Sequence, residues 1–387
     1  MSTTEARFFA DPQVCTLPPF APCYLERVAD REVLAALLRG ESCHLFAPRM
    51  SGKSSLLVRT ATCLRAQGRR VAAVDAFSLG RTDDAEHALA GLACMLAVRL
   101  GDEEVADAVS SAPEARMTAD RFVALMQGVG QRPPPGPCVL IVEDVLEHMR
   151  SFPGPWAGLL AALERLLDGG SHGDPAGSFT FCWLNAQTPD LVWPQEQGLP
   201  AVFGREIELA DFSREELAPW WAGLTAEGRC DTAGADALLD RIHHWTAGHP
   251  ALSMEVASAL ERTLSGEHRP DPPRSAGPHP DSLVDELVQR LFLSRPAGGP
   301  ASEALHYLEG YMARAFEGSP RTLAIYRDLL AGRHETGTDD AEPLSRLRVS
   351  GLVAGREGHW YVRNRIFASV LGLEWLEQVE TRLRLKP

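Results

Sequence analysis

Ala47-Pro48-Arg49-Met50-Ser51-Gly52-Lys53-Ser54 is the stretch of this 387-residue sequence that decides its fold. It fits the pattern G-x-x-x-x-G-K-[ST] at every fixed position except the first, where alanine replaces glycine. Only two of the chain's 38 Lys+Arg residues are lysines, and Lys53 is one of them. A compact ammonium fits between the β- and γ-phosphates of a nucleotide, where a planar guanidinium is bulkier. The octapeptide therefore predicts a phosphate-binding loop.

The residues on either side of this loop predict a strand before it and a helix after it. Residues 43–46 form a short run of apolar character, and residues 54–67 have a helix-favouring composition. Backbone N–H groups of such a loop wrap a phosphate, and the helix N-terminus adds partial positive charge. We expect Lys53 to neutralise phosphate charge and Ser54 to coordinate Mg²⁺. Ala47 is tolerable only if its φ is negative. The residues expected to contact the nucleotide here are Pro48, Arg49, Met50, Ser51, Gly52, Lys53, Ser54 and Ser55.

A second motif is the run Cys138-Val139-Leu140-Ile141-Val142-Glu143-Asp144, which predicts a buried parallel strand that ends in two carboxylates. Sheets of this class bind ligands at the carboxyl ends of their strands. We expect Glu143 to hold Mg²⁺, directly or through water, and Asp144 to orient or deprotonate the attacking water. Most ATPases of this type have the order Asp-Glu, so Asp144 is one methylene short and hydrolysis is expected to be slow. The alternative is a strand end with solvated acids and no catalytic role.

The composition is that of a globular chain long enough for two or three domains. Apolar residues make up 45%, and the net charge of −14 disfavours unspecific binding to nucleic acid or anionic membranes. The eight cysteines form no C-x-x-C pair, which is typical of reduced core residues in a cytosolic protein. No signal peptide is recognisable, and no stretch approaches roughly 18 uninterrupted apolar residues. We therefore expect a cytoplasmic location.

Predicted strands alternate with predicted helices in the first half of the chain, which indicates a parallel α/β sheet with right-handed crossovers. The expected strands cover residues 43–46, 71–77, 138–144, 179–184 and 206–209. A hairpin is expected near the C-terminus, where Leu352-Val353 and Trp360-Tyr361-Val362 flank a glycine-containing turn. We predict four segments: a nucleotide-binding α/β domain over 1–211, a helical lid over 212–265, a Pro-rich linker over 266–280, and a helical and winged-helix domain over 281–387.

With these motifs, the chain resembles the AAA-like P-loop ATPases related to the STAND group of signal-transduction NTPases. The resemblance extends from Pro18 to Gln378, and the first glycine of the phosphate loop is often missing in that family. It implies a P-loop NTPase sheet followed by a helical lid and a winged helix. Besides the phosphate loop, the segments that carry it are Tyr24-Leu25-Glu26-Arg27, Gly204-Arg205-Glu206-Ile207-Glu208-Leu209 with Asp211-Phe212, Trp245-Thr246-Ala247-Gly248-His249-Pro250, and Arg363-Asn364-Arg365-Ile366-Phe367 with Glu374-Trp375-Leu376.

The resemblance implies nucleotide contacts outside the phosphate loop. Arg27 belongs to the motif that lies beside the adenine, and Pro250, in its G-x-P turn, would contact the base or ribose. Arg363 and Arg365 would either reach back to the nucleotide or lie on the surface of the wing. His249 is expected to pack between helices rather than to ligate a metal, because no further ligands have suitable spacing.

The resemblance also implies catalytic residues. Asn185 or Thr188, after the strand beside the acidic one, is expected to hydrogen-bond the γ-phosphate or the lytic water. The alternative is an ordinary turn at the end of a strand. Arg205 is expected to supply positive charge to the transition state, in cis or from a neighbouring subunit. An ion pair with a glutamate of its own strand, Glu206 or Glu208, is the alternative.

The expected nucleotide is ATP, because the chain has no Asn-Lys-x-Asp guanine motif. We predict an ATP/ADP- and Mg²⁺-dependent switch with slow hydrolysis, which regulates or assembles with a separate partner or effector protein in bacterial signalling or defence. A nucleotide-dependent homo-oligomer fits the same prediction. One alternative is a scaffold that binds nucleotide without hydrolysing it. The other is a winged-helix DNA-binding regulator, but residues 321–387 hold eleven Lys+Arg against nine Asp+Glu, which is little charge for a duplex.

Overall fold

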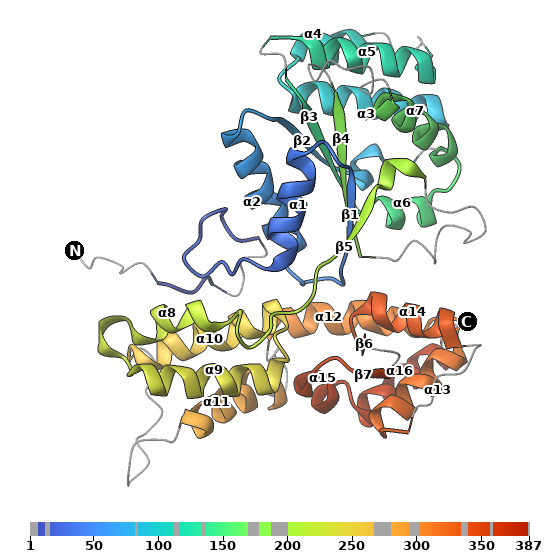
Figure 1. The fold of residues 1–387 in the computed structure, drawn as a ribbon. Coiled ribbons are helices and arrows are strands. Elements are labelled where there is room, and N and C mark those ends of the chain that lie inside the picture. Colours follow the sequence, from blue (N-terminus) through green and yellow to red (C-terminus); the bar gives the residue numbers. More distant parts are fainter. Residues whose placement is uncertain are drawn as a thin grey trace. The chain divides into compact units, whose positions relative to one another are not determined.

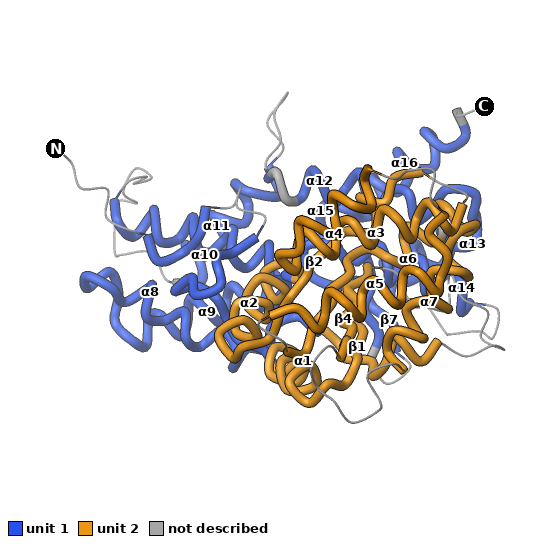
Figure 2. Tube along the Cα trace, turned by 90° about the horizontal axis from the view of Figure 1, so that it is seen from above, with its two compact units in different colours: residues 1–27, 48–52, 210–387 blue, residues 28–47, 53–209 orange. Residues whose placement is uncertain are grey.

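A computed structural model of the protein describes residues 7–11, 16–81, 84–111, 116–133, 136–168, 178–186, 200–266, 280–294, 302–333, 340–356 and 359–385. The chain divides into two compact units, coloured separately in Figure 2. Unit 1 contains residues 1–27, 48–52 and 210–387, and unit 2 contains residues 28–47 and 53–209. None of the helices that the described residues form is long and apolar enough to cross a membrane.

Unit 2 is built on a parallel sheet of five strands in the order β2-β3-β4-β1-β5 (Figure 1). All residues of β1 and β4 are buried, which is why both strands are mostly apolar runs without alternation. The register pairs Asp75 with Glu143 and Phe46 with Asn185, so these four strand ends lie along one edge of the sheet. The strands are β1 (Cys43–Phe46), β2 (Arg70–Asp75), β3 (Cys138–Glu143), β4 (Phe179–Asn185) and β5 (Arg205–Glu208).

Alternate residues along the strands of unit 2 contact different helical layers. On one face, Ile141 and Leu184 share a core with α1 and α2. On the other face, Leu140 and Trp183 share a core with α3, α5 and α7. Figure 1 shows these two layers on opposite sides of the sheet. The helices of unit 2 are α1 (Val28–Leu38), α2 (Lys53–Ala66), α3 (Ala85–Arg99), α4 (Glu103–Ser110), α5 (Ala119–Gln131), α6 (Val145–Ser151) and α7 (Trp156–Asp168), with short turns η1 (Ala76–Leu79) and η4 (Ala201–Phe203).

Unit 1 is mainly helical and ends in an antiparallel hairpin and two further helices. The hairpin pairs β6 (Val353–Arg356) with β7 (His359–Val362). The helical elements are η5 (Ala218–Trp220), α8 (Trp221–Thr225), η6 (Ala226–Gly228), α9 (Thr232–Thr246), α10 (Pro250–Leu264), α11 (Pro280–Val288), η7 (Gln289–Leu293), α12 (Glu303–Ala313), η8 (Arg314–Phe316), α13 (Pro320–Leu330), α14 (Ala341–Ser350), α15 (Arg365–Val370) and α16 (Leu373–Leu385).

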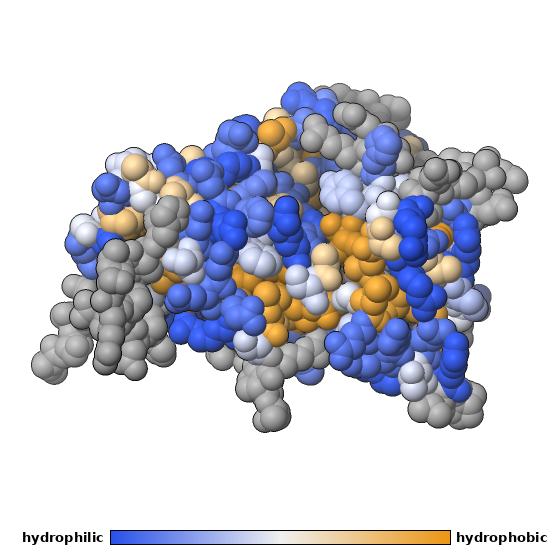
Figure 3. Space-filling model, turned by 90° about the horizontal axis from the view of Figure 1, so that it is seen from below, coloured by the Kyte–Doolittle hydropathy of each residue, from blue (hydrophilic) through white to orange (hydrophobic). Residues whose placement is uncertain are grey.

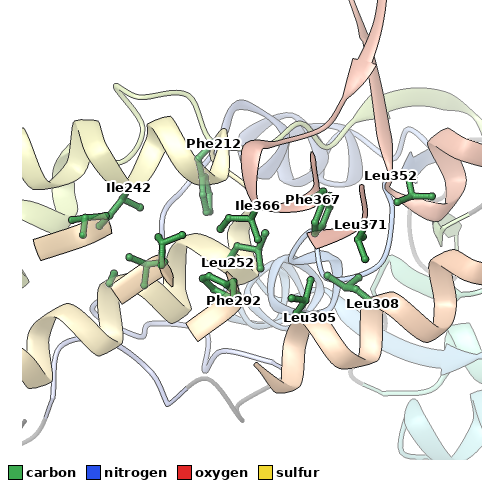
Figure 4. Close-up of a cluster of buried hydrophobic side chains, with 14 of the residues drawn as sticks. Phe212, Ile242, Leu252, Phe292, Leu305, Leu308, Leu352, Ile366, Phe367 and Leu371 are labelled. Atoms are coloured by element: carbon green, nitrogen blue, oxygen red, sulfur yellow. The ribbon is translucent and has the colours of Figure 1, made fainter. Parts of the chain in front are cut away.

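One hydrophobic core joins the parts of unit 1 that are distant in sequence. Figure 4 shows Leu252 of α10, Phe292 of η7, Leu305 of α12 and Phe367 of α15 within this core. Some residues that pack against it, such as Leu293, are only partly buried. Figure 3 shows hydrophobic residues in the middle of the face seen from below, with hydrophilic side chains around them.

The N-terminal residues join unit 1 through contacts with its helices. Phe9 is buried and meets Trp220 edge to face, with ring centroids 5.2 Å apart. Trp220 Nε1 donates a hydrogen bond of 2.8 Å to the carbonyl of Cys23. The N–H groups of Phe8 and Phe9 donate to the two carboxylate oxygens of the buried Glu261. These contacts place residues 7–11 and 16–27 on the helical unit, although the sequence pattern suggested that they belong with the sheet.

The predicted α/β organisation is confirmed, and the bounds of the five predicted strands agree with the observed ones to within two residues. The helical stretch after residue 212 and the C-terminal hairpin are also present. Gly355, which was expected in the hairpin turn, lies instead in β6 opposite Trp360. Most of the predicted linker, residues 267–279, lies outside the described residues. The compact units divide at Leu209 and Ala210, and residues 1–27 and 48–52 of the predicted 1–211 domain belong to unit 1.

Candidate functional site

The loop between β1 and α2 has two residues with left-handed backbone. Met50 has a φ of 62° and Gly52 a φ of 86°. Ala47 is not among the residues with positive φ, so an alanine is tolerated at this position, as expected for a loop that lacks the first glycine. A left-handed residue other than glycine costs roughly 1–2 kcal/mol, so Met50 is the strained position of the loop. The pattern G-x-x-x-x-G-K-[ST] did not indicate this residue.

Lys53 is the first residue of α2, and its side chain turns back over the loop. Its Nζ donates a hydrogen bond of 2.6 Å to the carbonyl of Ala47. An ammonium carries three donors, so it can bind this carbonyl and a further oxygen acceptor. The charge of Lys53 also lowers the pKa values of Glu143 and Glu147, against the stronger effects that raise them. The lysine and these carboxylates therefore lie close together, as the two sequence motifs predicted for Glu143.

Glu143 lies at the end of β3 and is the centre of a group of carboxylates. Burial raises its pKa most, and the charges of Asp144 and Asp75 raise it further. A hydrogen bond from the Ser54 side chain acts in the opposite direction. Asp75 is the last residue of β2 and pairs with Glu143 in the sheet register. The structure thus brings Ser54 and Glu143 together, as predicted, and adds Asp75.

Asp144 connects β3 to α6 with a left-handed backbone. Its φ is 53° and its ψ is 32°, and its side chain does not cap the helix that follows. Its N–H donates to the carbonyl of Leu184 at 2.8 Å, which fixes the peptide at the carboxyl edge of the sheet. Strained residues of this kind are concentrated at functional sites, where the surrounding structure holds them.

Asn185, the predicted sensor, is buried at the end of β4. Its Oδ1 accepts a hydrogen bond of 2.9 Å from the N–H of Leu146 in the first turn of α6. Its Nδ2 is buried and finds no hydrogen-bond partner among the described residues. At this edge of the sheet, the Nδ2 group could donate a hydrogen bond to a γ-phosphate or to a lytic water. Thr188, the other candidate, lies outside the described residues.

Glu147 is a site residue that the sequence reasoning missed. Its Oε1 accepts a hydrogen bond of 2.6 Å from the N–H of Ala186, directly after β4. Burial, followed by the charge of Asp144, raises its pKa. Together with the bond between Asn185 and Leu146, this contact joins the start of α6 to the end of β4. The only signal in the sequence was a third acid soon after the acidic strand end.

Arg205, predicted to act in catalysis, lies away from this group within unit 2. It is the first residue of β5 and pairs with Cys43, the first residue of β1, whereas Glu143 is the last residue of β3. Arg205 therefore lies at the amino edge of the sheet, opposite the carboxylates. Its guanidinium is half-exposed and lies 3.4 Å from the carboxylate of Glu32. The structure supports the ion-pair alternative, with Glu32 of α1 as the partner rather than a glutamate of β5.

The middle of the phosphate loop, residues 48–52, belongs to unit 1 and contacts side chains of that unit. Nη1 of Arg27 donates to the carbonyl of Ser51 at 2.9 Å and to that of Ala210 at 3.2 Å. Nη2 of Arg363 donates to Oγ of Ser51 at 3.2 Å. Arg363 is buried, so it does not lie on a wing surface. It binds Asp211 through two hydrogen bonds, at 2.7 Å and 2.5 Å.

Asp211 and His249 complete this cluster of unit 1. Burial tends to raise the pKa of Asp211, but the charge and the hydrogen bonds of Arg363 lower it overall, with a smaller contribution from the charge of Arg27. Burial, followed by the charge of Arg363, lowers the pKa of His249 to about 3, so this histidine is neutral at physiological pH. Among the described residues, no three His, Cys, Asp or Glu side chains are placed to hold a metal ion.

Two more of the predicted contact residues lie in unit 1. Nη1 of Arg49 donates to the hydroxyl of Tyr307 at 3.2 Å, and its guanidinium lies 5.0 Å from the ring centroid of Tyr311. Both tyrosines belong to α12. Pro250 is the first residue of α10, where its missing N–H costs nothing because helix N-termini leave such groups unbonded. Arg365, the second residue of the predicted wing pair, is the first residue of α15.

Comparison with known proteins agrees with this fold. The chain is similar to a Walker-type ATPase of Pyrococcus abyssi, with a TM-score of 0.57 and 12% identity over 93% of this chain and 99% of the other. It is equally similar to the ORC2 protein of Aeropyrum pernix in its ADPNP–ADP complexes, with a TM-score of 0.57 and 14% identity over 97% of each chain. The chain therefore has the fold of Walker-type P-loop ATPases.

Comparison of sequences adds a relative of higher identity, whose own length is much greater. An uncharacterised WD repeat-containing protein of Synechocystis is 24% identical over 375 residues, which is 94% of this chain. The chain spans only 30% of the length of that relative. None of the known family models matches the sequence.

Proposed function

We propose that the protein is an ATP-binding switch whose Mg²⁺-dependent hydrolysis is slow. The observation that carries the proposal is the proximity of its two motifs, in which Lys53 and Ser54 at the start of α2 both lie close enough to Glu143, at the end of β3, to lower its pKa against the effect of burial. Lys53, next to Ser54, acts electrostatically on the same carboxylate. An ammonium, a hydroxyl and a carboxylate beside a phosphate loop form the set of groups that Mg²⁺–ATP requires.

The residues present fit a magnesium ion bound together with a nucleotide. Mg²⁺ usually keeps several waters and takes one or two carboxylates plus substrate phosphates. Ser54 and Glu143 would supply one hydroxyl and one carboxylate. Burial and the nearby Asp144 and Asp75 raise the pKa of Glu143, so the group has more negative charge than Lys53 offsets. When bound, the ion would neutralise charge on the β- and γ-phosphates.

The remaining residues of the carboxyl edge have separate proposed roles. Asp144 would accept a proton from the attacking water or orient it, because it follows Glu143 directly and is held by its bond to Leu184. The buried Nδ2 of Asn185 would donate to the γ-phosphate or to that water. Lys53 would donate to a phosphate oxygen in addition to the carbonyl of Ala47. Arg205 takes no part within one chain, so its predicted charge contribution applies only to a neighbouring subunit.

The regulatory part of the proposal rests on the family resemblance and on the order of elements in unit 1. Helices α8 to α10 have the order of a helical lid, and α13, α14, β6, β7 and α15 that of a winged helix. We infer that these segments respond to whether ATP or ADP is bound, as in STAND-type NTPases. A ligand can bias two arrangements only if it contacts them differently, so ATP must bind one of them better than ADP does.

We also infer that the switch acts on a separate partner or effector protein, in bacterial signalling or defence and in the cytoplasm. The name of the longer Synechocystis relative, a WD repeat-containing protein, supports the part of this inference that concerns a protein partner. WD repeats form propellers with extended interaction surfaces. A nucleotide-dependent homo-oligomer is compatible with the same proposal.

Isothermal titration with ATP, with and without Mg²⁺, tests the proposed function. We expect Lys53→Ala to abolish ATP binding with the fold intact, and Lys53→Arg to weaken it sharply because the guanidinium has a different shape. The only other lysine of the chain, Lys386, supplies the matched control, since Lys386→Ala removes the same charge elsewhere. ATP affinity in Lys53→Ala equal to that of the wild type would refute the proposed phosphate loop.

A second candidate function is a scaffold that binds nucleotide without hydrolysing it. The observation in its favour is that Asp144, in the position of the base, has a shorter side chain than the usual glutamate and a left-handed backbone. Steady-state phosphate release separates the two functions. Turnover that stops in Asp144→Asn supports the switch ATPase, whereas ATP binding without measurable turnover in the wild type supports the scaffold.

A further inference from the structure

Ser51, in the middle of the phosphate loop, is held by two arginines that lie far from it in sequence. Ser51 is fully buried. Arg27 binds its carbonyl at 2.9 Å, and Arg363 binds its hydroxyl at 3.2 Å. The loop therefore has one backbone contact and one side-chain contact at the same residue. Arg363 comes from the C-terminal part of the chain, 312 residues after Ser51.

The backbone at Ser51 explains why such contacts matter. The residues before and after it, Met50 and Gly52, both have positive φ. Backbone N–H groups in a conformation that alternates in this way can converge on an anion. Met50 does not favour this conformation by itself, so the surrounding structure must hold it. A hydrogen bond to the side chain of Ser51 fixes the residue between the two left-handed positions.

Arg363 is well placed to fix Ser51 because its own position is determined on both sides. Its guanidinium forms a two-pronged ion pair with Asp211, with Nε to Oδ2 at 2.7 Å and Nη2 to Oδ1 at 2.5 Å. Its backbone N–H donates to the carbonyl of Leu352, just before β6, at 2.9 Å. The next residue, Asn364, caps α15 by accepting from the N–H of Phe367 at 2.8 Å. Side chain and backbone are therefore both anchored.

We propose that Arg363 is a positioning residue for nucleotide binding, which acts through Ser51 to hold the phosphate loop in its binding conformation, with Asp211 as the residue that holds Arg363. The inference rests on the proposed ATP-binding function. Through Arg363, the C-terminal hairpin would control the affinity of the loop for nucleotide. Any movement of β7 that withdraws Arg363 would release Ser51. The nucleotide affinity of the loop would thus depend on the state of the C-terminal elements.

The contacts of Arg363 also differ from those of an ion pair that serves stability alone. Nη1 of Arg363 is buried and finds no hydrogen-bond acceptor among the described residues. Leaving a buried donor without a partner is costly, so the geometry is not optimised for the pair itself. Arg321 and Asp340 form another ion pair in the same unit, in which Nε and Nη2 of the more exposed Arg321 donate to one oxygen at 2.9 Å and 2.6 Å. That pair joins α13 to the residue before α14 and supplies a matched control.

A double-mutant cycle on ATP affinity tests the proposal in the full-length protein. Isothermal titration with Mg²⁺–ATP would compare the wild type with Ser51→Ala, Arg363→Gln and the double variant. We expect each single variant to weaken binding roughly tenfold or more, as for the loss of a hydrogen bond to a charged group. We expect the double variant to bind no more weakly than Arg363→Gln, because the same contact is already lost. Asp211→Asn should weaken binding in the same direction.

The controls separate positioning from general stability. Arg321→Gln should lower the melting temperature but leave ATP affinity within about twofold of the wild type. Should Arg363→Gln not fold, Arg363→Lys keeps the charge beside Asp211 but loses the two-pronged geometry, and is expected to show intermediate affinity. Wild-type affinity in the folded Arg363 variants, or additive effects of Ser51→Ala and Arg363→Gln, would overturn the inference while ATP binding itself stands. A wild type that does not bind ATP would overturn the proposed function as well.

Discussion

At the scale of single residues, the surroundings of two carboxylates shift their pKa values in opposite directions. Glu143 is partly buried and lies among other acids, so its pKa is raised. Asp211 is also partly buried, but Arg363 supplies a charge partner and two hydrogen bonds, so its pKa is lowered. The acids around Glu143 would be stabilised by a bound cation, whereas Asp211 already forms an ion pair with Arg363. The contrast supports a ligand site at Glu143 and a positioning pair at Asp211.

The two carboxyls should therefore affect stability in opposite ways as pH changes. The folded pKa of Glu143 lies above its unfolded value, so its contribution is present at low pH and is lost as pH rises from the ordinary carboxyl range through the raised pKa. Glu143→Gln should flatten this loss and stabilise the protein at neutral pH. The folded pKa of Asp211 is lowered, so its contribution is present above the ordinary aspartate pKa and is lost as pH falls through the lowered value.

Asp211→Asn should accordingly destabilise the protein at neutral pH and have less effect in acid. Thermal melting of both variants between about pH 4 and 8 checks the two signs, in buffers of constant ionic strength. Parallel curves for the wild type and Glu143→Gln would mean that the surroundings of Glu143 do not raise its pKa.

A second prediction concerns the order of the acidic pair Glu143-Asp144. Asp144→Asn keeps a residue type that tolerates left-handed backbone, so it should bind ATP almost as the wild type does but stop hydrolysis. Glu143→Gln should instead weaken the Mg²⁺-dependent part of binding. The double change Glu143→Asp with Asp144→Glu should raise the rate, because the longer base reaches the water better. Steady-state phosphate release measures all three, and a rate that falls in the double variant would mean that the two roles are assigned the wrong way round.

At the scale of elements, the turn between α9 and α10 shows how closely unit 1 is packed. Gly248 has a φ of 76°, and its carbonyl accepts a hydrogen bond of 3.0 Å from the N–H of Phe212. A Cβ on Gly248 would lie 1.8 Å from the carbonyl oxygen of Phe212. Phe212 follows Asp211, so this contact also fixes the carboxylate that holds Arg363. The glycine of the G-x-P motif is thus explained by a close approach of two backbones.

Gly248→Ala should destabilise the protein by about 3 kcal/mol or more, because it adds a backbone clash to the cost of a left-handed alanine. Gly228 supplies the matched control, with a φ of 73° and no neighbouring atom within 4 Å of the position that a Cβ would take. Gly228→Ala should cost only about 1 kcal/mol. Urea unfolding monitored by circular dichroism compares the two. Similar losses in both variants would contradict the close contact with Phe212.

At the scale of the whole molecule, net charge and nucleotide binding separate the proposed switch from a DNA-binding regulator. The net charge of −14 opposes the phosphate contacts that a duplex binder needs. Binding of ATP to the folded state alone stabilises it, by about 2.7 kcal/mol at a ligand concentration a hundredfold above Kd. Both properties can be measured on the same preparation.

We expect Mg²⁺–ATP to raise the melting temperature and expect no salt-sensitive binding to duplex DNA. Differential scanning fluorimetry with ATP, ADP or buffer measures the first, and fluorescence anisotropy of a labelled duplex over a range of salt concentrations measures the second. Lys53→Ala is the control for the first measurement, because it should remove the shift. Tight duplex binding that weakens steeply with salt, without any effect of ATP on melting, would reverse the order of the two functions.

The parallel sheet, the loop between β1 and α2 and the acidic end of β3 could all be predicted from the sequence. These features are local, because each strand and each loop is specified by consecutive residues whose burial or backbone chemistry can be read from their types. Strand ends of a parallel sheet meet at one edge, so the approach of Ser54 to Glu143 followed from the motifs alone. The hairpin near the C-terminus was predictable for the same reason.

Only the tertiary structure decided which distant residues complete the site. Ser51, Asp211 and Arg363 meet although 152 residues separate the last two, and no periodicity in a sequence encodes such a meeting. The position of Arg205 at the far edge of the sheet likewise depended on strand register rather than on residue type. Met50 has a left-handed backbone that its own preference disfavours, so the packing around it sets its conformation. Contacts of this kind arise from the folded arrangement of the chain, which is why local reasoning could not supply them.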